Sequence, residues 1–302
     1  MTRRIRQGFT LIELLVVIAI MVVLYGLMLA RLAPGAGRQC RDAANALATA
    51  LNEAWSRGLG NPAGSALVIE SAGNTSVSLA SASVPPPIEG SVAGPVGGSV
   101  SVLNATDPAG LANGSRIQFF RTGSGAVPPS PWFGYANGVL SLRAAAGQTA
   151  DNTIWPIGDG LQCRVLCRPV KAERVAVLPK MAAIDLRSSG IENDATYASL
   201  AGKGDITVAF DGFGGVAGLW VNNVEVPPAP VYFLVAAQAD IERSQAAPLA
   251  SGVSRWVVVS PQSGRVTVAA NVAQPLTAPA TVTAQHIRDA RAFAQPGASS
   301  GR

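Results

Sequence analysis

Residues 1–30 read MTRRIRQGFTLIELLVVIAIMVVLYGLMLA, and this stretch determines what is expected of the rest of the chain. The arginines Arg3, Arg4 and Arg6 precede Gly8, after which residues 9–30 are apolar apart from one acid, Glu13. A helix over these residues would be roughly 33 Å long, enough for a hydrocarbon core of ~30 Å. We therefore predict a transmembrane helix over 9–30, with the basic leader in the cytoplasm and the bulk of the chain across the membrane.

Two ordinary kinds of signal explain this stretch less well. A cleaved signal peptide needs small residues at −3 and −1 of the cut, but Ala30 has Met28 at −3 and Ala33 has Arg31. Gly35 and Gly37 fit that role poorly. A plain signal anchor accounts for the length of the run but not for the order Gly-Phe-Thr-Leu-Ile-Glu.

The order of residues 8–16, GFTLIELLV, resembles the N-terminal signal of type IV pilins and type II secretion pseudopilins. The resemblance covers about a tenth of the chain. It implies that a prepilin peptidase cuts between Gly8 and Phe9 on the cytoplasmic face and that the new amino group of Phe9 is methylated. It also implies that Glu13 acts in filament assembly, with other pilin or pseudopilin subunits and an inner-membrane assembly platform as partners.

The chemistry of Glu13 agrees with that role. A carboxylate in an apolar helix is costly and is a functional candidate by default. After the cut, a neighbouring subunit could bring its positive N-terminus to Glu13, which would neutralise both charges and fix the register of the two helices. The alternative is an acid near the end of the helix that reaches toward water without a partner.

Composition indicates a strand-rich and loop-rich domain outside the cytoplasm. Only 14% of residues are charged and 6% aromatic, whereas the chain has 32 glycines and 21 prolines. Removing residues 1–8 takes away three arginines and no acid, so the formal net charge falls from +5 to +2. The basic balance is thus partly a property of the leader, and no nucleic-acid partner is predicted. The expected location is the bacterial inner membrane, single-pass, with the C-terminal domain in the periplasm.

The expected fold class is α+β, shaped like a pilin lollipop. A long N-terminal helix, bent near Pro34, packs on an antiparallel β-sheet domain. Its amphipathic second half lies within 31–60, where Ala44, Leu47, Leu51 and Trp55 share one face, with Trp55 as a core anchor. A β-rich domain over 61–273 follows, with a loop-rich insertion at 61–150. Residues 274–302 form a polar, partly disordered tail with a short helix near 282–293.

Strand-like segments occur in both halves of that domain. The expected strands are 66–70, 76–79, 99–103, 116–120, 139–142, 205–210, 216–221, 231–237, 255–260 and 265–270. The last two flank Pro261-Gln262-Ser263-Gly264, a hairpin connection. Residues 185–270 resemble the C-terminal half of the GspH/FimT minor pseudopilins, in which Ser260, Gly264, Arg265 and Val266 match the closing hairpin.

No constellation of residues indicates an enzyme. The single histidine, His286, lies in the predicted polar tail, which argues against a Ser-His-Asp or Cys-His site, and one histidine cannot form a multi-histidine metal site. The glycines of 210–215 join two strands and are interpreted as a turn. No calcium-binding spacing of acids occurs, and we predict no catalytic residue, metal or cofactor.

The cysteines are Cys40, Cys163 and Cys167. Cys40 is expected as a small apolar residue or a thiol at a helix interface. Cys163 and Cys167 could be joined by a disulfide if their backbone is helical or bent. On an extended strand, four residue steps span about 13 Å, beyond the ~7 Å limit for a disulfide.

Three functions remain open at this point. The first is a non-enzymatic minor pseudopilin of a type II secretion system. The second is a minor type IV pilin in adhesion, motility or DNA uptake. The third is an anchored enzyme or binding protein whose leader resembles a pilin signal by coincidence.

Overall fold

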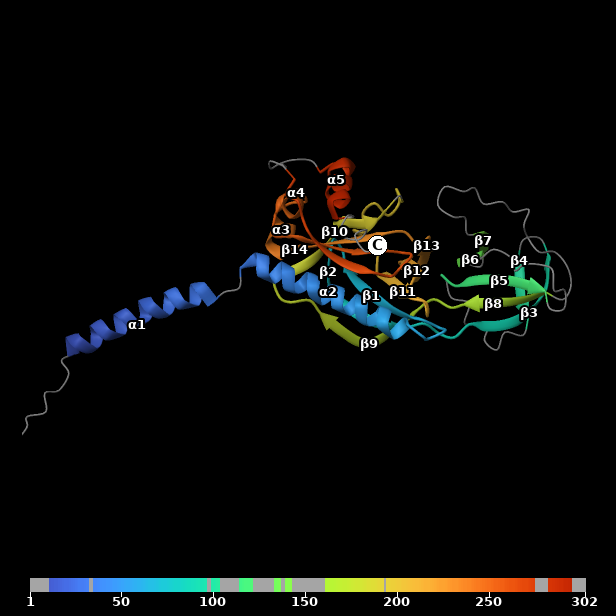
Figure 1. The fold of residues 1–302 in the computed structure, drawn as a ribbon, viewed down its shortest axis with the longest axis horizontal. Coiled ribbons are helices and arrows are strands. Elements are labelled where there is room, and N and C mark those ends of the chain that lie inside the picture. The colour runs from blue at the N-terminus through green and yellow to red at the C-terminus, as the bar shows by residue number, and fades with distance from the viewer. Residues whose placement is uncertain are drawn as a thin grey trace, which may run out of the picture.

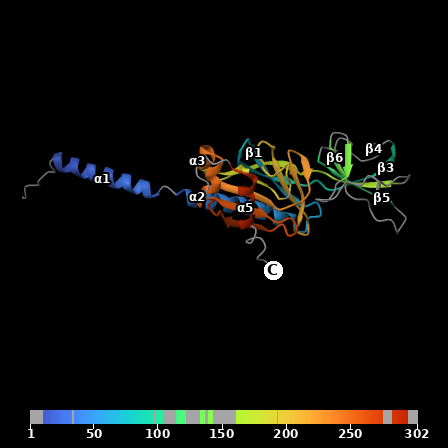
Figure 2. The same ribbon diagram turned by 90° about the horizontal axis from the view of Figure 1, so that it is seen from above.

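The computed structural model describes the secondary structure of residues 11–32, 35–96, 99–103, 114–121, 133–136, 139–142, 161–192, 194–274 and 282–294. Two helices lead into a domain built on a large antiparallel sheet, and a second sheet lies at the far end of that domain (Figure 1). Figure 2 shows the same order from above, with α1 at one end and the second sheet at the other. The expected α+β class with a large antiparallel sheet is confirmed.

The N-terminal helix is interrupted where the sequence predicts a bend. Helix α1 covers Leu11–Leu32 and α2 covers Ala36–Gly58. Gly35 between them has φ −59° and ψ 150°, an extended conformation. Pro34 itself lies outside the described residues. In the described part of the chain, no helix was found with the length and apolarity needed to cross a membrane. The membrane span over 9–30 thus stays a prediction from the sequence.

Helix α2 packs on the sheet through one face. Its buried residues recur at helical spacing and are Cys40, Ala43, Ala44, Leu47, Ala48, Leu51, Ala54 and Gly58. All of them except Cys40 and Gly58 belong to a core cluster that also contains apolar side chains of the sheet, and Trp55 packs against that cluster. This confirms the predicted apolar stripe, and the helix lies within the range expected for it.

The main sheet contains ten described strands. They are β1 (Ser65–Ala72), β2 (Thr75–Ser83), β9 (Val170–Val177), β10 (Ala182–Ile191), β11 (Ile206–Phe210), β12 (Val216–Val221), β13 (Val224–Val226), β14 (Val231–Ala237), β15 (Arg255–Val259) and β16 (Val266–Ala270). The order is β13-β12-β11-β1-β2-β10-β14-β15-β16, and β9 also pairs with β2. All of these printed pairings are antiparallel.

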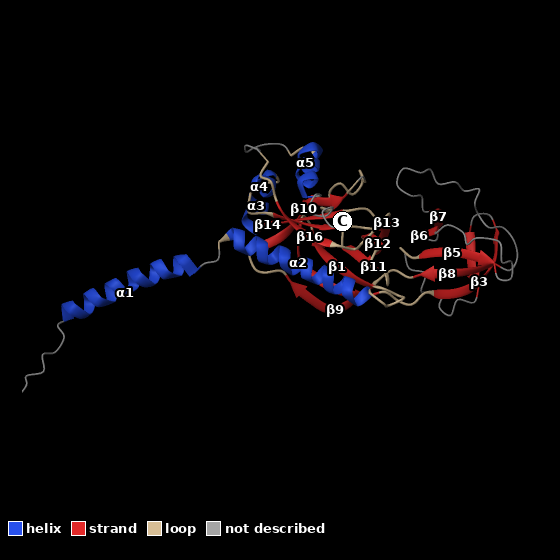
Figure 3. Cartoon of the chain, viewed as in Figure 1, coloured by secondary structure: helices blue, strands red, loops and turns tan. Residues whose placement is uncertain are grey.

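Both faces of this sheet are covered. Helix α2 lies on one face, and the helices α3 (Gln238–Arg243), α4 (Ala246–Ala250) and α5 (Ala284–Ala294) lie on the other (Figure 3). On that second face Tyr232 and Trp256 pack with Ala290 and Ala294 of α5. Coverage of both faces explains why every residue of β14 is buried.

The second sheet is an excursion from a hairpin of the main sheet. Its strands are β3 (Ile88–Val96), β4 (Ser99–Leu103), β5 (Arg116–Arg121), β6 (Phe133–Ala136), β7 (Val139–Leu142) and β8 (Leu161–Leu166), in the order β4-β3-β8-β5-β6-β7. The chain leaves after Ser83 of β2 and returns to β9 at Val170, and these two residues are paired neighbours. The separate sheet therefore spans 88–166, whereas residues 65–83 contribute β1 and β2 to the main sheet instead of to an insertion.

A buried polar contact joins the two sheets. The Nε of Arg116, on β5, lies 2.8 Å from Oε1 of Glu225, on β13, and both side chains are nearly buried. The guanidinium of Arg116 also donates to the carbonyl of Ala217 and stacks over Trp220 at 5.7 Å. Trp220 in turn donates its ring N–H to the carbonyl of Gly114. The second sheet is thus attached to the main sheet by β12 and β13, in addition to the chain connections.

Candidate functional site

The residues predicted for processing and assembly lie at the edge of what the structure describes. Arg3, Arg4, Arg6, Gly8 and Phe9 lie outside the described residues. Glu13 falls in the first turn of α1, and its side chain is outside the described part of the structure. Their roles therefore stay predictions from the sequence motif.

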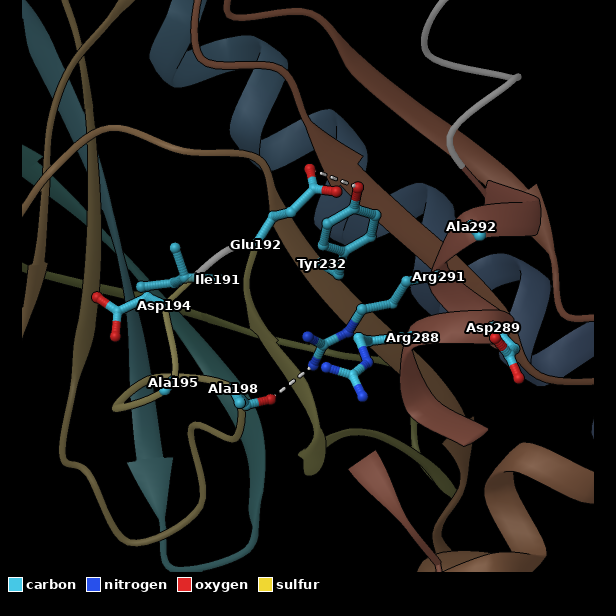
Figure 4. Close-up of a pocket in the computed structure, with 10 residues that line it drawn as sticks. All are labelled: Ile191, Glu192, Asp194, Ala195, Ala198, Tyr232, Arg288, Asp289, Arg291 and Ala292. Carbon is cyan, nitrogen blue, oxygen red and sulfur yellow. Dashed lines mark hydrogen bonds between the residues drawn. The ribbon is translucent and has the colours of Figure 1, made fainter. Parts of the chain in front are cut away.

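The structure contains a pocket that the sequence did not indicate. It has a volume of about 490 Å³ and lies between α5, the segment 191–198 and β14 (Figure 4). Its lining residues are Ile191, Glu192, Asp194, Ala195, Ala198, Tyr232, Arg288, Asp289, Arg291 and Ala292. No serine, threonine, cysteine, lysine or histidine is among these lining residues, and their ionisable groups are three carboxylates, one phenol and two guanidinium groups.

Arg291 holds α5 against the main sheet beside this pocket. Its side chain donates to the carbonyls of Ser188, at 2.5 Å, and Ala198, at 2.9 Å. The guanidinium also stacks on the ring of Tyr232 at 5.6 Å. These contacts connect α5 with strand β10, strand β14 and the segment after β10. Arg291 therefore fastens the C-terminal helix to three separate parts of the fold.

Burial makes the charged form of Arg291 energetically less favourable. The residue is only 7% exposed, and burial lowers the pKa of its guanidinium to about 10, against the opposing charges of Tyr232 and Glu192, which raise it. Among the described residues, no carboxylate lies within ion-pair distance of Arg291, and its Nε has no hydrogen-bond partner. Glu192 instead accepts a hydrogen bond from the hydroxyl of Tyr232 at 3.2 Å. The arrangement fits a structural fastening better than a reaction centre.

A bulge in β10 presents the carbonyl that Arg291 binds. Between Asp185 and Gly190 the register against β14 shifts, because β10 has extra residues there. The carboxylate of Asp185 accepts hydrogen bonds from the Ser188 hydroxyl and from Arg187, which fixes the bulge. Gly190 has no room for a side chain, since a Cβ would meet the Ala198 carbonyl and the Arg291 guanidinium. The cluster around Asp185 thus positions the partner of Arg291.

His286 has a local structural role. Its backbone N–H donates to the hydroxyl of Thr283, and its Nδ1 accepts from the Thr283 N–H, both at 3.3 Å. This reciprocal pair caps the start of α5, like a capping box with histidine in place of glutamate. No sequence pattern indicated the roles of Arg291 and Arg116, because their partners lie about a hundred residues away, or this cap, because it depends on side-chain geometry.

The segment of residues 210–215 is a turn, as predicted, and it lies against α2. The carboxylate of Asp211 accepts the N–H groups of Phe213 and Gly215. Trp55 packs against the core and donates its ring N–H to the Gly214 carbonyl at 2.8 Å. The N–H groups of Asp211, Phe213, Gly214 and Gly215 are thus bonded within the turn itself.

The disulfide considered possible between Cys163 and Cys167 is not formed in the structure. Cys163 lies within strand β8, and Cys167 follows one residue after the strand ends. An extended backbone keeps residues four positions apart too far from each other for a disulfide. Cys40 is a buried residue of α2, as expected of a small apolar side chain. Among the described residues, no group of three or more histidines, cysteines and acids could hold a metal ion.

Comparison with known proteins adds one finding, at the N-terminus. The prokaryotic N-terminal methylation motif matches residues 3–28, which include Gly8, Phe9 and Glu13. No curated protein and no solved structure matches the chain. The motif implies processing by a prepilin peptidase and assembly with other pilin subunits. Over these residues the chain carries the methylation motif of type IV pilins and pseudopilins, which supports its resemblance to that family.

Proposed function

We propose that this chain is a minor pseudopilin, a structural subunit of a type II secretion pseudopilus. It is made with a single membrane-spanning helix in the inner membrane and a periplasmic domain, cut between Gly8 and Phe9, and assembled through its N-terminal helix. The observation that carries the proposal is the methylation motif at residues 3–28, in which Glu13 stands five residues after Gly8. The motif itself does not distinguish a type II secretion pseudopilus from a type IV pilus, and assignment to the pseudopilus is our proposal.

The closing hairpin favours this type of subunit. Strands β15 and β16 pair from Arg255–Ala270 to Val259–Val266, and the N–H of Ser260 donates to the carbonyl of Arg265 across the connection. This is the hairpin whose Ser260, Gly264, Arg265 and Val266 resemble the GspH/FimT pseudopilins. It supports the proposed subtype from a part of the chain remote from the motif.

A minor type IV pilin is the second candidate, because the methylation motif is common to pilins and pseudopilins. Genes for a secretin, a secretion ATPase and other pseudopilins beside this one would favour secretion. Deletion of the gene gives the direct test. Loss of secreted proteins with normal pili supports the pseudopilin, whereas loss of pili, motility or DNA uptake with normal secretion supports the pilin.

We propose no catalytic role. The single histidine caps α5, and Arg291, which lines the pocket, binds backbone carbonyls of the fold. The remoter alternative is an enzyme or binding protein held by a signal anchor. It would be favoured by an activity that survives removal of residues 1–37.

Processing is tested by intact mass and N-terminal sequencing of the protein from membranes of cells with a prepilin peptidase. A chain that begins with N-methylated Phe9 is expected. Substitution of Gly8 by leucine should block the cut, because the peptidase must fit a small residue before the bond. A chain that still begins at Met1, or that begins near residues 34–38, would contradict the proposal.

Assembly is tested by Glu13→Ala, with Leu15→Ala as the matched control in the same apolar run. Glu13→Ala should be cut normally but enter filaments poorly, because the N-terminal charge of a neighbour then lacks its partner. Leu15→Ala should be cut and should assemble. Normal incorporation of Glu13→Ala, measured by cross-linking to other subunits, would refute the role of Glu13.

A further inference from the structure

Arginines gather at the N-terminal end of α2. They line an open pocket of about 420 Å³ formed by Gly37, Arg38, Arg41, Asp42 and Arg255. Arg38 and Asp42 are 3.9 Å apart and both exposed, which makes a weak ion pair. The lining therefore has three guanidinium groups and one carboxylate. Guanidinium groups bind phosphate oxygens with two parallel hydrogen bonds, so this pocket suits a phosphate group.

The end of α2 adds to this positive character. Its N-cap residue is Gly35, which has no side chain to accept from the first amides, and its first turn contains no acid. The partial positive charge of the helix end is therefore not compensated within the first turn. One acid, Asp240, lies nearby: its charge raises the pKa of Cys40, whereas the charge of Arg255 lowers it. Asp240 is paired with Arg243 at 3.2 Å. The local excess of positive charge thus persists around the pocket.

An exposed apolar side chain stands beside the first turn of α2. Met181 is 63% exposed and has φ +70°, an unusual conformation for a residue other than glycine. Gln39 of α2 donates to its sulfur at 3.7 Å, and the N–H of Gln238 donates to its carbonyl. Lys180, next to it, is exposed. Apolar groups next to basic groups are typical of surfaces that lie on membranes.

The connection to α1 fixes how far this surface can be from the predicted anchor. Only three peptide steps separate Leu32 from Gly35, so the start of α2 lies within roughly 11 Å of the end of α1 at any angle between the helices. The apolar run ends at Ala30. The polar region of a bilayer extends roughly 5–8 Å beyond its hydrocarbon core. The surface is therefore within reach of the lipid headgroups.

We propose that the N-terminal end of α2, with Arg38, Arg41 and Arg255, binds the phosphates of anionic lipid headgroups, and that Met181 enters the same leaflet. The contact would hold the domain against the membrane while the subunit awaits assembly. This inference rests on the proposed function, because it needs the chain to be anchored through residues 9–30.

The test uses the full chain reconstituted at low density into vesicles of phosphatidylcholine alone or with ~30% phosphatidylglycerol. Hydrogen–deuterium exchange is measured for peptides covering 35–42 and 178–182. We expect slower exchange of both peptides in the anionic vesicles, by about fivefold for each arginine engaged. Raising the salt concentration should remove the difference, because these charges are exposed.

Two double variants make the test specific. Arg38→Gln with Arg41→Gln should abolish most of the lipid dependence, and both side chains are exposed, so the fold should be kept. Arg57→Gln with Arg265→Gln, which removes two exposed arginines away from the pocket, should keep it. Equal exchange in both kinds of vesicle, in a chain that floats with them, would overturn this inference alone. A chain that floats with neither would overturn the membrane anchor and this inference together.

Discussion

Arg291 shows how one side chain can hold an element in place. Replacing Arg291 with alanine should lower the free energy of unfolding by about 2–4 kcal/mol, because two buried carbonyls lose their donor and Tyr232 loses its packing partner. The matched control is Arg288→Ala on the same helix, where the side chain is exposed. Urea unfolding followed by tryptophan fluorescence measures both. Equal stability of the two variants would show that Arg291 does not fasten α5.

The cysteines should differ in reactivity and in their effect on stability. Burial raises the pKa of Cys40 and of Cys163 above the ordinary 9.0, whereas Cys167 is half-buried. Iodoacetamide at pH 8.5 should therefore modify Cys167 first in the folded protein, and all three cysteines in urea. Mass spectrometry of the adducts checks this, with Cys167→Ser as the control.

The same pKa shifts give stability a dependence on pH. Above about pH 9 the unfolded thiols lose their protons while the folded ones keep them, so the folded state binds more protons. Stability should thus be fully retained below pH 9 and should fall as the pH rises further. Cys40→Ala should make that fall shallower, and an unchanged slope would contradict the assignment.

At the scale of elements, α2 and two turns fit together around Trp55. Gly264 has φ +60°, and a Cβ there would meet the carbonyl of Gly214 and the ring of Trp55. Gly264→Ala should therefore cost about 1–3 kcal/mol, from the backbone conformation together with the clash. Gly60→Ala is the control, since Gly60 also has positive φ but has nothing within 4 Å of a Cβ. In thermal unfolding, Gly264→Ala should have a clearly lower melting temperature than Gly60→Ala. The reverse order would refute the close fit around Trp55.

At the scale of the whole molecule, the ion pair of Arg116 and Glu225 couples the two sheets. Arg116→Met should cost about 3–5 kcal/mol, because Glu225 is left buried without its cation. The double variant Arg116→Met with Glu225→Leu should recover much of that loss. The exposed pair Arg164–Glu89, within the second sheet, is the comparison and should give under about 1 kcal/mol in the same cycle. An additive result for Arg116 and Glu225 would show that the sheets are held together by other contacts.

Several helices and strands of the structure could be predicted from local sequence patterns alone. The alternation in 206–210 and the continuous apolar run in 231–237 identified β11 and β14, and the spacing of Leu47, Leu51 and Trp55 identified α2. Strands β3, β6, β9, β10 and β13 were not predicted. In β10 the polar residues Asp185, Ser188 and Ser189 hide the strand pattern, because they are buried by bonding to one another within a bulge.

The sequence by itself determined the N-terminal motif, the class of the fold and the face of α2 that packs on the sheet, because these depend on residues close together in the chain. The tertiary structure decided the rest. It placed the second sheet at 88–166, on a hairpin between β2 and β9, and it brought Arg291 to Ser188 and Arg116 to Glu225. These contacts join residues about a hundred positions apart, and the register and burial that pair such residues exist only once the chain has folded.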